Sequence, residues 1–106
     1  MVTRTSARQK EVKMKHFIIV KWNDAAKMKS QTEAIETLFK KTLVIPGIDA
    51  VEIHPSCSDR ANRYDLMIEI RMDPDALPVY DDCEPHHLWK EQYGGEIAHK
   101  VIFDCE

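Results

Sequence analysis

The chain has 106 residues, of which 43% are hydrophobic and 31% charged, and its formal net charge is −3. This length suits one domain, and the composition is that of a folded globular protein. A weakly acidic chain does not favour nucleic-acid binding, which needs a concentrated basic face. No apolar run approaches the roughly 20 residues that cross a bilayer. We therefore expect neither a nucleic-acid nor a membrane partner.

The cysteines bear on the compartment. Cys57, Cys83 and Cys105 are an odd number and have no CxxC spacing. This pattern argues against a disulfide framework and favours a reducing compartment, so we expect the cytoplasm. None of the three has a sequence context typical of a reactive thiol.

Residues 1–13 differ from the rest of the chain. Four basic residues against one glutamate give this segment +3, which leaves −6 for residues 14–106. It has almost no apolar content, so it does not resemble a secretory leader. We predict a disordered, dispensable arm over 1–13 and a folded domain over 14–106.

The hydrophobic pattern after the arm predicts the element order β-α-β-β-α-β. Helical spacing of apolar residues favours a first helix, and strict alternation after Tyr64 favours a strand. Ile45-Pro46-Gly47 ends the first helix. The predicted elements are a strand over 15–22, a helix over 25–43, strands over 48–54 and 64–72, a helical stretch that begins at Asp73-Pro74, restarts at Pro85 and ends at Gly94-Gly95, and a strand over 98–104.

Two such halves predict a ferredoxin-like α+β fold, with a four-stranded antiparallel sheet and both helices on one face. On the first strand, Phe17 and Ile19 alternate with Ile18 and Val20, so this strand is apolar on both faces. A strand of that kind must be buried twice. The simplest second cover is the sheet of another subunit, which predicts a two-fold homodimer with Phe17 and Ile19 in its interface.

Several segments carry a family signature in the expected order. They are the strand KHFIIVKW over 15–22, Ile45-Pro46-Gly47, Arg63-Tyr64-Asp65-Leu66, Tyr80 with Pro85-x-His87, and Val101-Ile102-Phe103-Asp104. Together they resemble the stress-responsive α/β-barrel (Dabb) domain family over residues 14–104. The resemblance implies a ferredoxin-like fold, a homodimer whose two sheets form a central α+β barrel, and a link to stress responses.

The same resemblance implies site residues. In cyclase-like members, a histidine at the place of His16 lines the substrate cavity, while the tyrosine and second histidine of the helix segment carry acid–base work in an aldol-type ring closure. That chemistry needs a neutral imidazole to move a proton and a phenol to hold developing oxyanion charge. Alternatively, His16 is a core histidine bonded to a backbone carbonyl, and we keep both readings.

This sequence departs from the family segment at two points. Glu84 replaces the first histidine, and one extra residue separates Tyr80 from Pro85. If the family segment is aligned on Pro85, the site histidine is His87. If it is aligned on Tyr80, the site histidine is His86. We prefer His87, because proline fixes the helix start. The two imidazoles differ by roughly 100° around a helix, so only one enters the pocket. The catalytic candidates are His16, Tyr80 and His87, and Trp22 and Trp89 are expected to line the ligand pocket with them.

No cofactor is expected. His16, Cys83, His86, His87 and His99 have no zinc-site spacing, so we expect no metal. Five acidic residues and no basic one between Asp73 and Glu84 should repel anionic ligands from the pocket mouth. Three functions remain open. Our preferred interpretation is a homodimer that binds a small apolar molecule; the others are a cofactor-free, polyketide-cyclase-like lyase or isomerase, and a structural module without a ligand.

Overall fold

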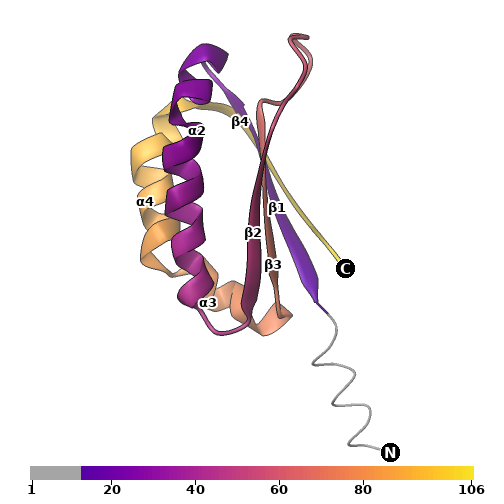
Figure 1. Ribbon diagram of the computed structural model, residues 1–106, viewed down its shortest axis with the longest axis vertical. Coiled ribbons are helices and arrows are strands. Elements are labelled where there is room, and N and C mark those ends of the chain that lie inside the picture. The colour runs from indigo at the N-terminus through magenta and orange to yellow at the C-terminus, as the bar shows by residue number, and fades with distance from the viewer. Residues whose placement is uncertain (1–12) are drawn as a thin grey trace, which may run out of the picture.

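The chain folds into a twisted antiparallel sheet that is covered by helices on one face only (Figure 1). The computed structural model describes residues 13–106, and the sheet has the strand order β2-β3-β1-β4. Among these residues, no helix is long and apolar enough to span a bilayer. The elements are β1 (Met14–Trp22), α2 (Ala25–Lys40), β2 (Ile48–Pro55), β3 (Leu66–Met72), α3 (Leu77–Asp81), α4 (Glu84–Tyr93) and β4 (Ile97–Cys105), with 3-10 turns at Lys41–Val44, Pro74–Ala76 and Gly94–Glu96. The predicted ferredoxin-like α+β protomer is confirmed.

Helix α2 begins at a cap that the sequence provides. The Asp24 carboxylate accepts hydrogen bonds from the backbone N–H groups of Ala26 at 3.0 Å and Lys27 at 3.3 Å. The helix ends at Lys40 rather than at residue 43, and its last turn tightens into a 3-10 turn. The chain then reverses at Gly47, whose φ of 95° suits glycine.

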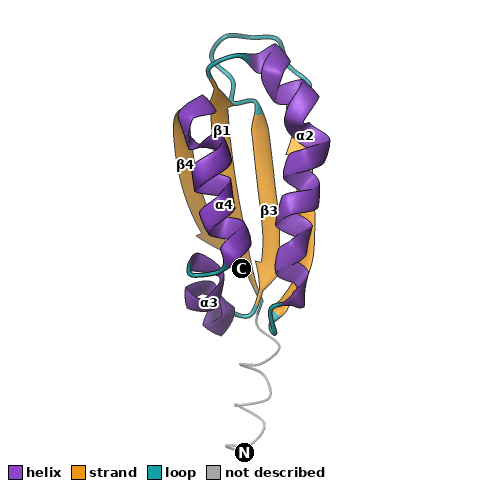
Figure 2. Cartoon of the chain, turned by 90° about the vertical axis from the view of Figure 1, so that its left-hand side faces the viewer, coloured by secondary structure: helices purple, strands orange, loops and turns teal. Residues whose placement is uncertain are grey.

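Strand β1 is central and pairs with β3 on one side and β4 on the other (Figure 2). Its middle residue Ile18 lies opposite Ile68 of β3 and Ile102 of β4. Strand β3 is shorter than predicted, because Asp65, just before it, bonds to β1 at the end of the β2–β3 loop. The Asp65 backbone N–H donates to the Val20 carbonyl at 2.9 Å, and the Asp65 carboxylate accepts from the Trp22 N–H at 2.7 Å.

The core lies between the sheet and the helices. Trp22 from β1 and Phe39 from α2 both pack against Trp89 of α4, with ring centroids 6.1 and 5.0 Å from it. All three residues are at most 3% exposed. Trp22 and Trp89, which we expected to line a pocket, are therefore part of a packed aromatic cluster.

The opposite face of the sheet has no cover from any described element. Phe17 of β1 lies across from Phe103 of β4, with ring centroids 6.4 Å apart, and Ile19 lies across from Val101. Phe103 is 56% exposed and Val101 43%. The prediction that β1 is apolar on both faces is confirmed, and we call these four residues the apolar patch.

The predicted arm falls mostly outside the described residues, which begin at Lys13. The Lys13 amine lies 2.8 Å from the Asp49 carboxylate and 2.7 Å from that of Asp73. These exposed ion pairs raise the pKa of Lys13, mainly through its hydrogen bond with Asp49. The folded part of the chain thus includes Lys13 as well as the strand that starts at Met14.

Candidate functional site

Three aromatic side chains from β1, α3 and α4 meet at the end of the sheet where β1 begins. The His16 ring packs edge-on against the Tyr80 ring, with centroids 5.4 Å apart, and Tyr80 packs against His86 at 4.8 Å. His16 points to the helix side of β1, as its alternation predicts, and is 6% exposed. The structure therefore brings His16 and Tyr80 together, as the resemblance implies.

His16 is oriented by a carboxylate rather than by a backbone carbonyl. Its Nδ1 lies 2.6 Å from Oδ1 of Asp104, which is its cross-strand partner on β4. A carboxylate oxygen accepts, so Nδ1 carries the donated proton, and in the neutral form of the ring Nε2 is the unprotonated nitrogen. This contact fixes both the tautomer and the direction of the ring. Asp104 belongs to the last family-like segment, but we had not predicted a role for it.

Tyr80 is the most buried member of the group. It is 0% exposed, and its hydroxyl has no hydrogen-bond partner within residues 13–106. Burial raises the pKa of Tyr80 far above its ordinary value, with smaller contributions from Cys83 and Asp81. The phenol therefore stays neutral and offers a proton for a hydrogen bond. Buried hydroxyls are almost always paired, so the Tyr80 hydroxyl needs an acceptor that residues 13–106 do not supply.

The structure places His86, not His87, against Tyr80, which corrects our preferred register. The side chain of His87 is 53% exposed and lies 3.6 Å from the exposed carboxylate of Asp82. Helix α4 begins at Glu84, one residue before Pro85, and α3 ends at Asp81. The extra residue is absorbed in the turn between these helices. His86, six residues after Tyr80, is therefore the histidine that reaches the site.

His86 has one ring nitrogen in a hydrogen bond and one without a partner among residues 13–106. Its Nδ1 donates to the Asp81 carbonyl oxygen at 2.9 Å, because a carbonyl oxygen can only accept. Nε2 is then left with its lone pair. Burial lowers the pKa of His86, and the hydrogen bond to Asp81 opposes this only in part. A neutral imidazole with a free Nε2 is the form that takes up a proton.

These side chains pack on one another rather than around an open cavity. None of the five principal cavities in the described part of the chain is lined by His16, Tyr80 or His86. A cavity of about 190 Å³ borders Asp104 at the same end of the sheet. A ligand that reaches Tyr80 must therefore displace part of the packing around it.

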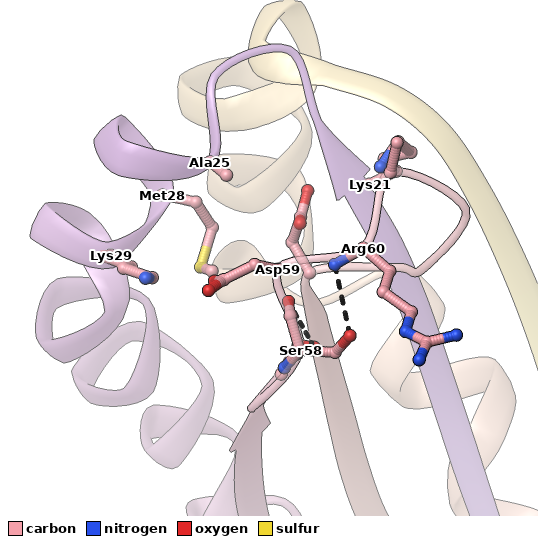
Figure 3. Close-up of a pocket in the computed structure, with 10 residues that line it drawn as sticks. Lys21, Ala25, Met28, Lys29, Ser58, Asp59 and Arg60 are labelled. Carbon is pink, nitrogen blue, oxygen red and sulfur yellow. Dashed lines mark hydrogen bonds between the residues drawn. The ribbon is translucent and has the colours of Figure 1, made fainter.

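A better enclosed cavity lies at the other end of β1 and has different chemistry. Its volume is about 200 Å³, and it lies between α2 and the β2–β3 loop (Figure 3). Lys29 and Met28 lie on one side, and Ser58, Asp59 and Arg60 on the other. Both signs of charge line it, and no imidazole or phenol does. Lys21 of this cavity is five residues from His16, roughly 16 Å along a strand, so this cavity is separate from the aromatic group.

A cluster of charged and polar side chains lies on the open face of the sheet. Glu52 and His54 of β2 and Glu69 and Arg71 of β3 form a network of polar contacts: Arg71 makes ion pairs with both glutamates, and His54 lies within 3.1–3.8 Å of them. Glu69 is 7% exposed. Arg71 lowers the pKa of Glu69 by donating a hydrogen bond, with a smaller effect from His54. We missed this group in the sequence. The sequence signal for this cluster is the spacing of two between Glu52 and His54 and between Glu69 and Arg71, because residues two apart on a strand share a face.

Comparisons with known proteins show the fold. No protein-family model matches the chain, and neither does any curated protein. Among solved structures, a dimeric ferredoxin-like protein of unknown function from Thermobifida fusca is similar with a TM-score of 0.73 and 21% identity, over 88% of this chain and 89% of that one. A Dabb family protein with a ferredoxin-like fold from Mesorhizobium loti has a TM-score of 0.60 and 14% identity, over 89% and 95% of the two chains.

The hydroxynitrile lyase from Passiflora edulis is also similar, with a TM-score of 0.65 and 12% identity, over 88% of this chain and 91% of that one. All three identities are low, so the likeness concerns the backbone. The chain has the ferredoxin-like α+β fold that these proteins share.

Proposed function

We propose that the chain is a Dabb-type homodimer that binds a small, uncharged carbonyl compound at Tyr80. The observation that carries this proposal is the buried Tyr80 hydroxyl without a partner, held between two imidazoles. A neutral, buried phenol donates to a hydrogen-bond acceptor, and a ketone or aldehyde oxygen is such an acceptor. The acidic residues between Asp73 and Glu84 oppose an anionic ligand.

The dimer part of the proposal rests on the apolar patch. Phe17, Ile19, Val101 and Phe103 occupy adjacent positions on β1 and β4, and nothing in the described chain covers them. A second copy supplies a sheet of the same kind, and an isologous contact places equal patches against each other. The Thermobifida fusca protein, which shares this fold, is itself described as dimeric.

The location remains a proposal as well. We place the protein in the cytoplasm, because Cys57, Cys83 and Cys105 are free thiols, which suits a reducing compartment. A stress-related role is proposed on the resemblance to the Dabb family alone.

A ketone with a ¹³C-labelled carbonyl tests the binding proposal. We expect [carbonyl-¹³C]acetophenone to stabilise the native protein in a thermal shift assay, and its carbonyl resonance to move downfield as Tyr80 donates to it. The variant Tyr80→Phe should retain the ring contacts but lose the carbonyl shift. The matched control is Tyr64→Phe, because Tyr64 is 38% exposed and lies outside the group. A carbonyl shift that is the same in wild type and Tyr80→Phe would rule out binding through the hydroxyl.

A second candidate function is a cofactor-free lyase or isomerase, which the state of His86 favours. Its Nε2 is unprotonated and its pKa is lowered, so it can take a proton from the carbon next to a carbonyl. The C–H electron pair then forms the C=C bond of an enolate, and the carbonyl π electrons move to oxygen. The Tyr80 O–H stabilises that oxygen by a hydrogen bond. The similarity to a hydroxynitrile lyase agrees with a lyase on this fold.

Deuterium exchange at the methyl group of acetophenone in D₂O measures this proton transfer directly. We expect exchange above the buffer rate in the wild type, and a loss of roughly 10²–10⁴-fold in His86→Gln. His87→Gln is the matched control, since that side chain is exposed and should leave the rate unchanged. Exchange no faster than in buffer would remove the enzymatic candidate and leave ligand binding as the function.

A further inference from the structure

Two glutamates face each other on the open face of the sheet. Glu52 of β2 lies directly opposite Glu69 of β3 in the strand register. Like charges at such a position are destabilising. His54 lies two residues along β2, so its side chain shares the face with both carboxylates. A positive charge close to Glu52 and Glu69 is needed to offset their repulsion.

The donor atoms of these residues converge. Nε2 of His54 lies 3.1 Å from Oε1 of Glu69 and 3.8 Å from Oε2 of Glu52. One ligand atom from each residue lies within 4.8 Å of the other two. A zinc ion bound at about 2.0–2.2 Å in tetrahedral geometry separates its ligand atoms by roughly 3.3–3.6 Å. The three atoms reach that spacing through small side-chain rotations.

Arg71 holds the outer oxygens of both carboxylates. Its Nε donates to Oε2 of Glu69 at 2.8 Å, and its Nη2 lies 3.4 Å from Oε1 of Glu52. The inner oxygens, Oε1 of Glu69 and Oε2 of Glu52, are the ones that point to His54. Ligating carboxylates in metal sites are oriented by outer partners in this way. Arg71 thus leaves the inner oxygens free of its own contacts. Oε1 of Glu69 accepts a hydrogen bond from Nε2 of His54, and an ion would replace this hydrogen bond as that nitrogen loses its proton.

We propose that Glu52, His54 and Glu69 bind a divalent first-row transition metal ion, with Zn²⁺ as the fitting ion. An imidazole nitrogen favours zinc, nickel, copper or iron over magnesium and calcium, which prefer oxygen ligands alone. Three protein ligands leave a fourth position for water or for a group from a second copy. The site lies on the same open face as the apolar patch, but its ligands all come from one protomer. It does not depend on ligand binding at Tyr80.

Calorimetric titration of the chelator-treated full chain with ZnCl₂ tests this site. We expect one ion per chain, and an affinity weakened by at least about tenfold in both His54→Ala and Glu52→Gln. His99→Ala is the matched control, because His99 is an exposed histidine on β4 outside the cluster. We avoid Glu69 variants in the main comparison, since Glu69 is buried and pairs with Arg71.

A second readout locates the ion. Titration with Co²⁺ should give visible d–d absorption in the wild type and in His99→Ala, and the His54 ring resonances should broaden. Equal Zn²⁺ affinity in wild type and His54→Ala would overturn the proposal, as would the absence of any one-to-one binding. If His54→Ala loses binding only because it unfolds, its circular dichroism will show this, and the exposed Glu52→Gln variant then decides.

Discussion

Removing the hydroxyl of Tyr80 should make the protein more stable. The residue is 0% exposed, and its hydroxyl has no partner among the described residues. Tyr80→Phe keeps the ring, its edge-on contact with His16 and its packing against His86. The substitution therefore isolates the effect of one buried polar atom.

The expected size follows from the cost of burying an unpaired hydroxyl. That cost is about 1–3 kcal/mol in proteins, and phenylalanine removes it without breaking a hydrogen bond. We expect the free energy of unfolding to rise by about 1–2 kcal/mol. In a domain of this size, about 1 kcal/mol moves the Tm by roughly 4–8 °C, so the shift should be easy to measure.

Urea and thermal unfolding of both proteins provide the assay. The protomer concentration must be equal, because the Tm of a dimer depends on it. Tyr64→Phe controls for loss of a tyrosine hydroxyl at a more exposed position, and its effect should stay within about 0.5 kcal/mol. A less stable Tyr80→Phe would show that the hydroxyl is hydrogen-bonded in the folded protein. The argument that it awaits a ligand would then fail.

Three further predictions concern the interface, a histidine and the N-terminal segment. Ile19→Asp should convert the proposed dimer to monomers in sedimentation velocity, whereas Val44→Asp, at a site 85% exposed, should not; a monomeric wild type would contradict the proposed assembly. Because burial lowers the pKa of His86 below the free value of about 6.5, the unfolded chain takes up this proton at a higher pH than the folded one. The free energy of unfolding that a neutral His86 contributes is therefore complete above about pH 6.5 and is lost as the pH falls from there through the lowered pKa. In urea unfolding measured against pH, His86→Gln should make the free energy of unfolding change less over that range. A chain that starts at Met14 should keep its oligomeric state and nearly its Tm, because the Lys13 ion pairs that it loses are exposed; a loss of several degrees would show that the removed segment makes stabilising contacts.

The fold was predictable because its signals are repeated along whole elements. The alternation through β3 and the helical spacing through α2 each involve several buried side chains, and one misleading residue does not change the pattern. Element ends depend on single contacts. Strand β3 starts at Leu66 because Asp65 bonds to Val20 and Trp22, and these contacts are specific to the folded chain.

The register of α4 shows where prediction from sequence failed. Pro85 is expected to begin the helix, but the helix begins at Glu84, and the turn before it absorbs the extra residue. An error of one residue rotates a helical side chain by roughly 100°, so it exchanges His86 for His87 at the site. The spacing from Tyr80 was the better guide, because the packing of Tyr80 in the core fixes the position of α3.

The Glu52–His54–Glu69 group was missed for a different reason. Metal-site spacings along a helix or a loop do not include it, because His54 meets its partners across two strands. Its contact with Glu69 depends on the β2–β3 register, which the length of the intervening loop does not determine from sequence alone. The spacing of Glu52 and His54 was visible, but their partner on β3 was not.

Strand β1 carries residues of both the Tyr80 site and the proposed dimer interface. On β1, His16 points to the helices and the adjacent Phe17 points to the open face, as alternation requires. A slip of one residue would place Phe17 beside Tyr80 and bring His16 onto the apolar patch, so both proposals depend on this register. On the β3 side the register is held by buried apolar side chains, since Ile18 pairs with Ile68 and both are at most 2% exposed. The residues that stabilise the sheet are thus the same ones that keep the aromatic group around Tyr80 and the open face apart.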